Sequence, residues 1–346
     1  MFFIVFIFYL LYYKVLIFFF NFNFLLELLS MLFLIVPVLM AVAFLTLMER
    51  KLLGSIQRRK GPNIVGLFGL LQPFADGLKL FTKETIIPSQ SQIYLFLFSP
   101  LLTFVLSITS WVVIPFGFDQ VLVNYDFGIL YIFALSSLST YGIIGSGWSS
   151  NSKYAFLGSL RSAAQILSYE IIIGFVFVII VLYSSSFNLH IIVEKQSTVW
   201  FFRPLLPFVL IFFIAILAET NRTPFDLPEA EAELVSGYNV EYSSMGFALF
   251  FIAEYSNILL MSSLICILFF GGWYPFFFFL GFIKGSFFFC LKVVFISFCF
   301  ILVRGSLPRY RYDQLMFLCW KTLLPLCLGL IFFFLSFYKF LFFFFL

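Results

Sequence analysis

Residues 161–183 read RSAAQILSYEIIIGFVFVIIVLY, and this stretch decides the fold class of the chain. It exceeds the ~20 apolar residues that a helix needs to cross the hydrocarbon core of a bilayer. Its only acid, Glu170, stands near the middle. Other stretches are similarly apolar, and together they predict about eight transmembrane helices. We expect these helices at residues 25–48, 93–116, 127–147, 161–183, 205–220, 246–270, 286–303 and 322–344.

The composition of the whole chain also indicates a membrane protein. Of its 346 residues, 63% are hydrophobic and 10% are charged, whereas soluble domains carry roughly a quarter charged residues. Because so few charges cannot cover a core of this size, we predict an all-α integral membrane protein. A further apolar run at 1–20 lacks a basic segment and a small-residue cleavage site, which argues against a signal peptide. We therefore predict an N-terminal hydrophobic extension at 1–24, with a ninth helix as an alternative, and a single membrane domain at 25–346.

The sequence offers no pattern for a cofactor held by this chain. The one histidine, His190, stands in a predicted loop, so it cannot supply a pair of axial ligands to a membrane haem. No Cys-x-x-Cys pair occurs, and no phosphate-binding loop is present. We expect the chain to carry no redox cofactor, nucleotide or metal. The cysteines, which all stand in apolar stretches, are Cys266, Cys290, Cys299, Cys319 and Cys327.

The basic residues predict the orientation of the chain in the membrane. The odd-numbered loops and their helix ends carry 14 Lys and Arg, and the even-numbered loops carry 3. The positive-inside rule then places the odd-numbered loops in the cytoplasm or matrix. These loops are long and polar, so they must pack on a partner or line a cavity. We predict them at residues 49–92, 148–160, 221–245 and 304–321, the first with short helices joined by tight turns.

Three acids stand within or at the end of predicted membrane helices. Glu170 and Glu254 are central in their helices, and Glu219 closes the apolar run 205–218. An acid at bilayer depth costs on the order of 3 kcal/mol to insert and usually faces a cavity or a partner. On one helix, Glu254, Asn257 and Met261 share a face. These acids indicate a path for protons, and the alternative is a set of polar groups that pair neighbouring helices.

A second acidic group stands in the loop 221–245. Capping of helix starts at Thr223 and Asp226 explains Asp226 and Glu229. It does not explain Glu231, Glu233 and Glu241. Crowded carboxylates raise one another's pKa values, so this group is also expected to handle protons.

Glu49 and Arg50 stand at the predicted end of the first helix. They form either a neutral pair at the interface or a charged pair that guards an entrance. The nearby run Arg58-Arg59-Lys60 is consistent with topology and with attraction to anionic lipid.

Long polar strings in these loops resemble one known family. The chain is similar to the NADH dehydrogenase subunit 1 family, which supplies the quinone-site membrane subunit of respiratory complex I. The resemblance covers about 25–330, which leaves the first residues as an extension. The strings are MERK at 48–51, QRRKGPN at 57–63, GLLQPFADGLKL at 69–80, SYE at 168–170, AETNRTPFDL at 218–227 and PRYRYDQL at 308–315.

The resemblance implies roles for particular residues. It implies an eight-helix subunit that forms part of a ubiquinone chamber and links quinone reduction to proton translocation. The implied proton-coupling acids are Glu170, Glu219, Asp226, Glu229, Glu231, Glu233 and Glu254. The implied chamber residues are Glu49, Arg50, Arg59, Asp76, Arg222 and Arg311.

The resemblance also implies partners and a location. Ubiquinone would be the substrate, and FMN and the iron–sulfur clusters would be bound by partner subunits. The expected partners are peripheral-arm subunits, one with the terminal cluster, small membrane-arm subunits and lipids, without nucleic acid. The expected location is the mitochondrial inner membrane, with a bacterial plasma membrane as the alternative. Other functions left open are a hydrogenase-type complex, a freestanding proton or ion transporter and a structural anchor.

Overall fold

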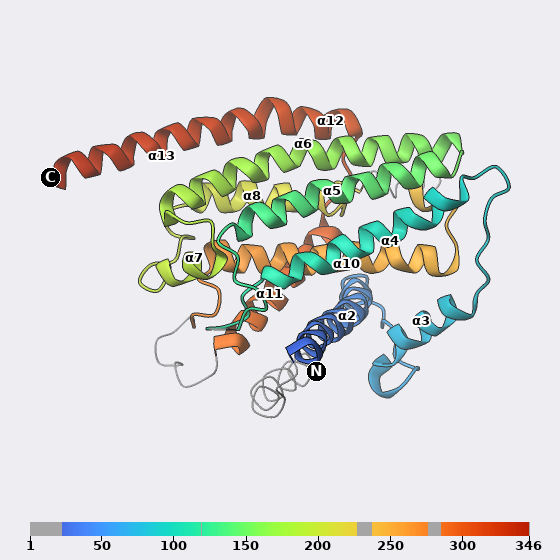
Figure 1. The fold of residues 1–346 in the computed structure, drawn as a ribbon. Coiled ribbons are helices and arrows are strands. Elements are labelled where there is room, and N and C mark those ends of the chain that lie inside the picture. The colour runs from blue at the N-terminus through green and yellow to red at the C-terminus, as the bar shows by residue number, and fades with distance from the viewer. Residues whose placement is uncertain (1–22, 119, 227–236, 276–284, 346) are drawn as a thin grey trace.

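The computed structural model describes residues 23–118, 120–226, 237–275 and 285–345, and these residues form helices and connections without a strand (Figure 1). The predicted extra helix at 1–20 and Glu229, Glu231 and Glu233 lie outside the described residues. The helices are α2 (Asn23–Ile56), α3 (Gln72–Thr82), α4 (Ile93–Thr109), α5 (Gly128–Ser149), α6 (Lys153–Ser184), α7 (Leu189–Lys195), α8 (Leu206–Glu219), α10 (Ser244–Phe269), α11 (Gly285–Ser306), α12 (Tyr312–Phe317) and α13 (Leu324–Phe345).

The prediction of an all-α membrane protein with about eight spans is confirmed. Among the described residues, 7 helical segments are long and apolar enough to cross a bilayer, and α8 is a shorter apolar helix. With 14 residues, α8 spans about 21 Å, which is less than the ~30 Å hydrocarbon core. One end of α8 therefore falls at bilayer depth.

Three predicted helix boundaries are wrong by eight or more residues. The last helix, expected to start at 322, begins at Tyr312, because α12 continues through a π-helix at Leu318–Leu323 directly into α13. The first helix does not end at 48 but continues to Ile56, because the charge of Glu49 is paired within the protein rather than with water. The connection expected at 148–160 consists of residues 150–152. There, Ser152 Oγ accepts a hydrogen bond from the Ala155 amide at 3.3 Å and starts α6 eight residues before the expected 161.

The polar segment after α2 has the short helices and tight turns that its composition predicts. A 3-10 helix at Leu67–Gly69 precedes α3. Gly66 and Gly69 have φ angles of 72° and 75°, a conformation in which a residue with a side chain would be strained.

The structure places His190 in a helix. It lies in the first turn of α7, where the Asn188 side chain accepts a hydrogen bond from the His190 amide. His190 is therefore not a loop residue.

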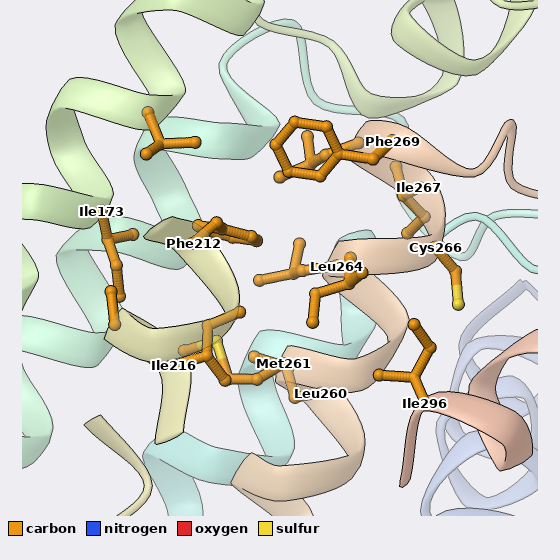
Figure 2. Packing of buried hydrophobic residues seen from close by; sticks show 14 of the residues in the cluster. Ile173, Phe212, Ile216, Leu260, Met261, Leu264, Cys266, Ile267, Phe269 and Ile296 are labelled. Carbon is orange, nitrogen blue, oxygen red and sulfur yellow. The ribbon is translucent and has the colours of Figure 1, made fainter. Parts of the chain in front are cut away.

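Helix α10 lies at the centre of the bundle. It packs against α2, α4, α8 and α11, while α6 packs against α5 and α8 (Figure 1). Figure 2 shows Leu260, Leu264 and Phe269 of α10 packed with Phe212 of α8 and Ile296 of α11. All five side chains are buried. This core fixes the position of Glu254, which α10 also carries.

Lys292 of α11 is buried with 2% of its surface exposed. Its ammonium donates hydrogen bonds to the carbonyls of Phe270, Gly272 and Tyr274 at 2.6, 2.9 and 2.6 Å. It also lies 4.5 Å from the ring centre of Trp200. A cation at the carboxyl end of a helix offsets the helix dipole, so Lys292 stabilises the end of α10 and the turn that follows.

Candidate functional site

A polar cavity among α4, α5, α8 and α10 contains two of the predicted acids. The empty space here, together with its opening to solvent, is about 660 Å³, and the wall includes Glu219 at the end of α8 and Glu254 of α10. Asn257 and Met261 line the same cavity, so the predicted shared face of α10 is confirmed. Serine side chains of α4 and α5 complete the polar part of the wall.

Glu170 joins this site through a serine. Ser136 of α5 lines the cavity, and its hydroxyl donates a hydrogen bond to Glu170 Oε1 at 3.2 Å. Glu170 is 5% exposed and comes from α6. Acids from three helices, α6, α8 and α10, therefore converge at one cavity. Their spacing along the chain could not reveal this, because it depends on how the helices pack.

The 3-10 helix at Gly237–Asn239 contributes one residue to the cavity wall. Tyr238 lines the cavity and donates a hydrogen bond from its hydroxyl to Glu254 Oε1 at 2.5 Å. Sequence reasoning did not single out Tyr238. Its position in the acidic loop, between Glu233 and Glu241, is the only signal that could have drawn attention to it.

Tyr242 anchors the segment between this 3-10 helix and α10. Its ring stacks on Phe96 of α4 with centroids 4.1 Å apart, and its hydroxyl lies 2.9 Å from Ser99 Oγ. Burial raises the pKa of Tyr242, whereas hydrogen bonds with the Ser149 and Ser99 hydroxyls lower it. The phenol therefore stays protonated at neutral pH and serves as a hydrogen-bonding anchor.

Other polar residues of α6 join segments of the chain rather than facing the cavity. The Gln165 amide donates to the carbonyls of Ala218 and Phe225 at 2.7 and 2.9 Å. The Tyr169 hydroxyl donates to the Leu315 carbonyl at 3.1 Å. Gln165 thus holds the segment that follows α8, including the approach to Asp226.

A second charged site surrounds Glu49, which is 6% exposed. Its carboxylate forms ion pairs with Arg304 of α11 and, at 3.4 Å, with Arg222 after α8. The hydroxyl of Tyr255 on α10 donates to Glu49 Oε2 at 2.5 Å. The Arg222 guanidinium lies 4.3 Å from the ring centre of Tyr255. We call Glu49, Arg222, Tyr255 and Arg304 the Glu49 cluster.

Glu49 and Arg50 do not pair with each other, because consecutive residues of a helix point in different directions. Arg50 instead forms an ion pair with Asp76 of α3 at 2.6 Å, and Gln72 donates to the same carboxylate at 3.0 Å. This pair is half-exposed, with 50% and 39% of the two side chains accessible. It holds α3 beside the end of α2.

The remaining predicted residues separate into buried and exposed ones. Asp226 is 3% exposed and lies 3.5 Å from a guanidinium nitrogen of Arg309. The helix start expected at Thr223 is wrong, because the Phe225 amide donates a hydrogen bond to the Arg222 carbonyl in a turn.

Two other predicted residues, Arg59 and Arg311, are exposed. The sequence did not mark Arg304 and Tyr255 as site residues. Basic residues at the ends of helices and tyrosines in a protein core are both common, so neither position stands out.

Comparison with known proteins gives a consistent result. The family described as NADH dehydrogenase matches residues 29–335 of this chain. The chain belongs to the NADH dehydrogenase family. Both the polar cavity and the Glu49 cluster lie within the matched part of this family member.

Individual relatives of this NADH dehydrogenase family member come from algae, plants and bacteria. NADH-ubiquinone oxidoreductase chain 1 of Chondrus crispus is 61% identical over 300 residues, which cover 86% of this chain and 92% of the relative. The protein of the same name in Arabidopsis thaliana is 57% identical, with 85% and 91% covered. An NADH-quinone oxidoreductase subunit of the bacterium Paramagnetospirillum magneticum is 56% identical, with 85% and 86% covered.

Proposed function

We propose that this chain is the membrane subunit of an NADH:ubiquinone oxidoreductase that links quinone reduction to proton translocation. The observation that carries the proposal is the convergence of Glu170, Glu219 and Glu254 at one polar cavity in the membrane bundle. Acids at bilayer depth are costly and rare, and those that occur usually face a cavity or a partner and mark a path for ions or protons. The names of the relatives, which are oxidoreductase chains, support the same conclusion.

The acids of the cavity would hold and release protons. Each carboxyl can exchange a proton with a neighbour through hydroxyl groups, and Ser136 and Tyr238 each bond one of the acids. A change of charge near the polar loops alters how readily each carboxyl group releases its proton, because a nearby positive charge favours the ionised carboxylate. In this proposal Asp226 and the acids at 229, 231 and 233 relay that change to the cavity.

The Glu49 cluster and the residues around α3 would form part of the ubiquinone chamber. Arg50, Arg59, Asp76 and Arg311 are at least partly exposed, so they are available to a quinone headgroup or a peripheral subunit. Glu49 and Arg222 are buried and would shape the chamber rather than bind the headgroup. Electrons would reach ubiquinone from an iron–sulfur cluster in a peripheral partner, with FMN further away. The mitochondrial inner membrane is the proposed location.

The test uses the assembled complex with a matched pair of serine variants and one acid variant. Glu254→Gln and Ser136→Ala should assemble normally, because neither removes a charge partner of the Glu49 cluster. Both should lower quinone-linked proton pumping in proteoliposomes severalfold while leaving NADH oxidation by an artificial acceptor unchanged. Ser137→Ala is the control, since Ser137 does not line the cavity and its hydroxyl donates to the Ala134 carbonyl of its own helix.

Two results would contradict the proposal. Normal pumping by Glu254→Gln would remove Glu254 from the proton path. A native gel in which this chain migrates without an NADH-oxidising band would favour a hydrogenase-type complex or a freestanding transporter.

A further inference from the structure

A small second core lies among α4, α5, α6 and α10, apart from the main core of Figure 2. Its buried side chains come from these four helices and from the segment that precedes α10. They are Phe96, Ile143, Ile166, Tyr238, Tyr242 and Phe250. This core therefore surrounds the short piece of backbone from which Tyr238 reaches Glu254.

The aromatic rings of the second core form a continuous row from α4 to Tyr238. Tyr242 stacks on Phe96 with an interplanar angle of 3°. Phe250 of α10 contacts Tyr242 edge to face at 5.0 Å and Tyr238 edge to face at 5.5 Å. Both stacked and edge-to-face contacts are favourable arrangements of aromatic rings. Tyr242 is the member of the row through which α4 holds the other two rings.

The hydroxyl of Tyr242 fixes where this ring lies. It donates a hydrogen bond to the Phe96 carbonyl at 3.2 Å. Because a hydroxyl has one hydrogen, it then accepts from the Ser99 hydroxyl at 2.9 Å. Ser149 Oγ, at the end of α5, lies 3.5 Å away. Stacking alone allows one ring to slide across another, whereas hydrogen bonds are directional. The hydroxyl thus sets the position of Tyr242 relative to α4 and α5.

The backbone connects Tyr242 to the 3-10 helix Gly237–Asn239. The Tyr242 amide donates to the Asn239 carbonyl at 3.1 Å. On its other side this 3-10 helix packs tightly on α6, since a methyl group added to Gly158 would lie 2.9 Å from the Cα atom of Gly237. Closely packed groups transmit a displacement rather than absorb it. A shift of Tyr242 therefore also moves the 3-10 helix.

Tyr238 is sensitive to such a shift. Its hydroxyl donates to Glu254 Oε1 at 2.5 Å, and a hydrogen bond weakens steeply when its distance and angle depart from the favoured values. A displacement of a few tenths of an ångström is about the size that matters for a hydrogen bond of this kind.

We propose that Tyr242 is a positioning residue for the polar cavity and that its hydroxyl holds the Tyr238 hydroxyl on Glu254. This inference rests on the proposed function, in which Glu254 holds and releases a proton. The alternative is that Tyr242 only stabilises the contact between α4 and α10. The two roles differ in one respect, because a positioning residue has no further effect once the group that it positions is absent.

The test compares single and double variants in the assembled complex in proteoliposomes. Tyr242→Phe keeps the stacked ring and removes the hydroxyl, so it should slow coupled quinone reduction about threefold. Combined with Tyr238→Phe, it should give the rate of Tyr238→Phe alone. Tyr141→Phe is the control, because it removes the hydroxyl of a tyrosine that is 67% exposed on α5. It should leave the rate unchanged.

The pH profile of coupled quinone reduction is the second readout. Tyr242→Phe and Tyr238→Phe should move the profile in the same direction, because both weaken a hydrogen bond to the same carboxyl group. A loss of stability alone would lower the rate by the same factor at every pH. Ser99→Ala removes one partner of the Tyr242 hydroxyl and should move the profile in that direction to a smaller extent.

Three results would overturn the inference. One is a rate for Tyr242→Phe equal to that of the unaltered complex. Another is a double variant that is slower than Tyr238→Phe alone, as independent effects would multiply. The third is a lower rate with an unmoved pH profile. If Tyr242→Phe does not assemble, Ser99→Ala with and without Tyr238→Phe gives the same comparison.

Glu254→Gln, measured in the same series, separates this inference from the proposed function. Normal pumping by Glu254→Gln refutes the proposed function and the inference with it. Impaired pumping by Glu254→Gln, together with independent effects of the two tyrosines, overturns the role of Tyr242 alone.

Discussion

The Glu49 cluster allows a quantitative prediction for Glu49→Gln. The substitution keeps the shape of the side chain but removes the anion that Arg222 and Arg304 share. Their side chains are 10% and 27% exposed, so water compensates only in part. Removing one partner of a buried ion pair costs about 3–5 kcal/mol. Because Arg304 retains some access to water, we expect the lower end, about 3 kcal/mol, which is roughly a hundredfold in equilibrium.

The assay measures how much complex survives heating. Membranes are warmed to a series of temperatures, extracted in mild detergent and separated on a native gel stained for NADH oxidation. Asp76→Asn is the matched control, because it neutralises an acid that also pairs with an arginine but is half-exposed. Such pairs contribute about 0–1 kcal/mol. Glu49→Gln should therefore lose the band at a clearly lower temperature than Asp76→Asn.

A double variant separates charge imbalance from lost packing. Glu49→Gln with Arg304→Gln removes the excess cation, so its loss should be smaller than the sum of the two single losses. Equal heat sensitivity of Glu49→Gln and Asp76→Asn would refute the reasoning, since burial would then have no effect on how much an ion pair contributes to stability. Strict additivity in the double variant would refute the assignment of Glu49 as the shared anion.

The structure supports three more predictions. Lys292→Met removes the ammonium that donates to the carbonyls of Phe270, Gly272 and Tyr274, so it should lower stability by at least about 2 kcal/mol. In the same heating assay, Lys195→Met should have no effect, because Lys195 is exposed. Gly147→Ala places a methyl group against the Ser159 hydroxyl and 2.9 Å from the Ala155 carbonyl oxygen, so it should reduce assembly on a native gel; Gly329→Ala, with no atom within 4 Å, should not. Tyr238→Phe removes the hydrogen bond to Glu254 and should slow coupled quinone reduction about fivefold, and an unchanged rate beside the exposed control Tyr154→Phe would contradict a role for that hydroxyl.

The membrane helices were predictable because apolar length is a local property of the sequence. Helices expected at 205–220 and 246–270 are observed at Leu206–Glu219 and Ser244–Phe269. The end of α2 was not predictable in this way. A charged residue such as Glu49 after an apolar run normally marks the end of a membrane helix. The cations that pair with it, Arg222 and Arg304, are far along the chain, so the sequence around Glu49 does not reveal them.

The acids of the polar cavity could be found from the sequence because each is anomalous where it stands. Glu170 and Glu254 interrupt apolar helices, and the cost of an acid there predicts a cavity. Their partners could not be found, since Ser136 and Tyr238 are ordinary in type and position. Convergence of three helices on one cavity depends on packing, which apolar length does not encode.

The order in which the Glu49 cluster forms has a consequence for biogenesis. Its members come from α2, from the segment after α8, from α10 and from α11, and Glu49 and Arg304 are separated by 255 residues. A nascent chain that has inserted α2 therefore carries Glu49 without Arg222 until the segment after α8 is made, and without Arg304 until α11 arrives. Contacts of such long sequence separation form late, because the entropy of closing the intervening chain must be overcome first. Membrane insertion of this subunit thus includes a late electrostatic step, in which Arg304 of α11 stabilises the buried acid of α2 before α13 follows.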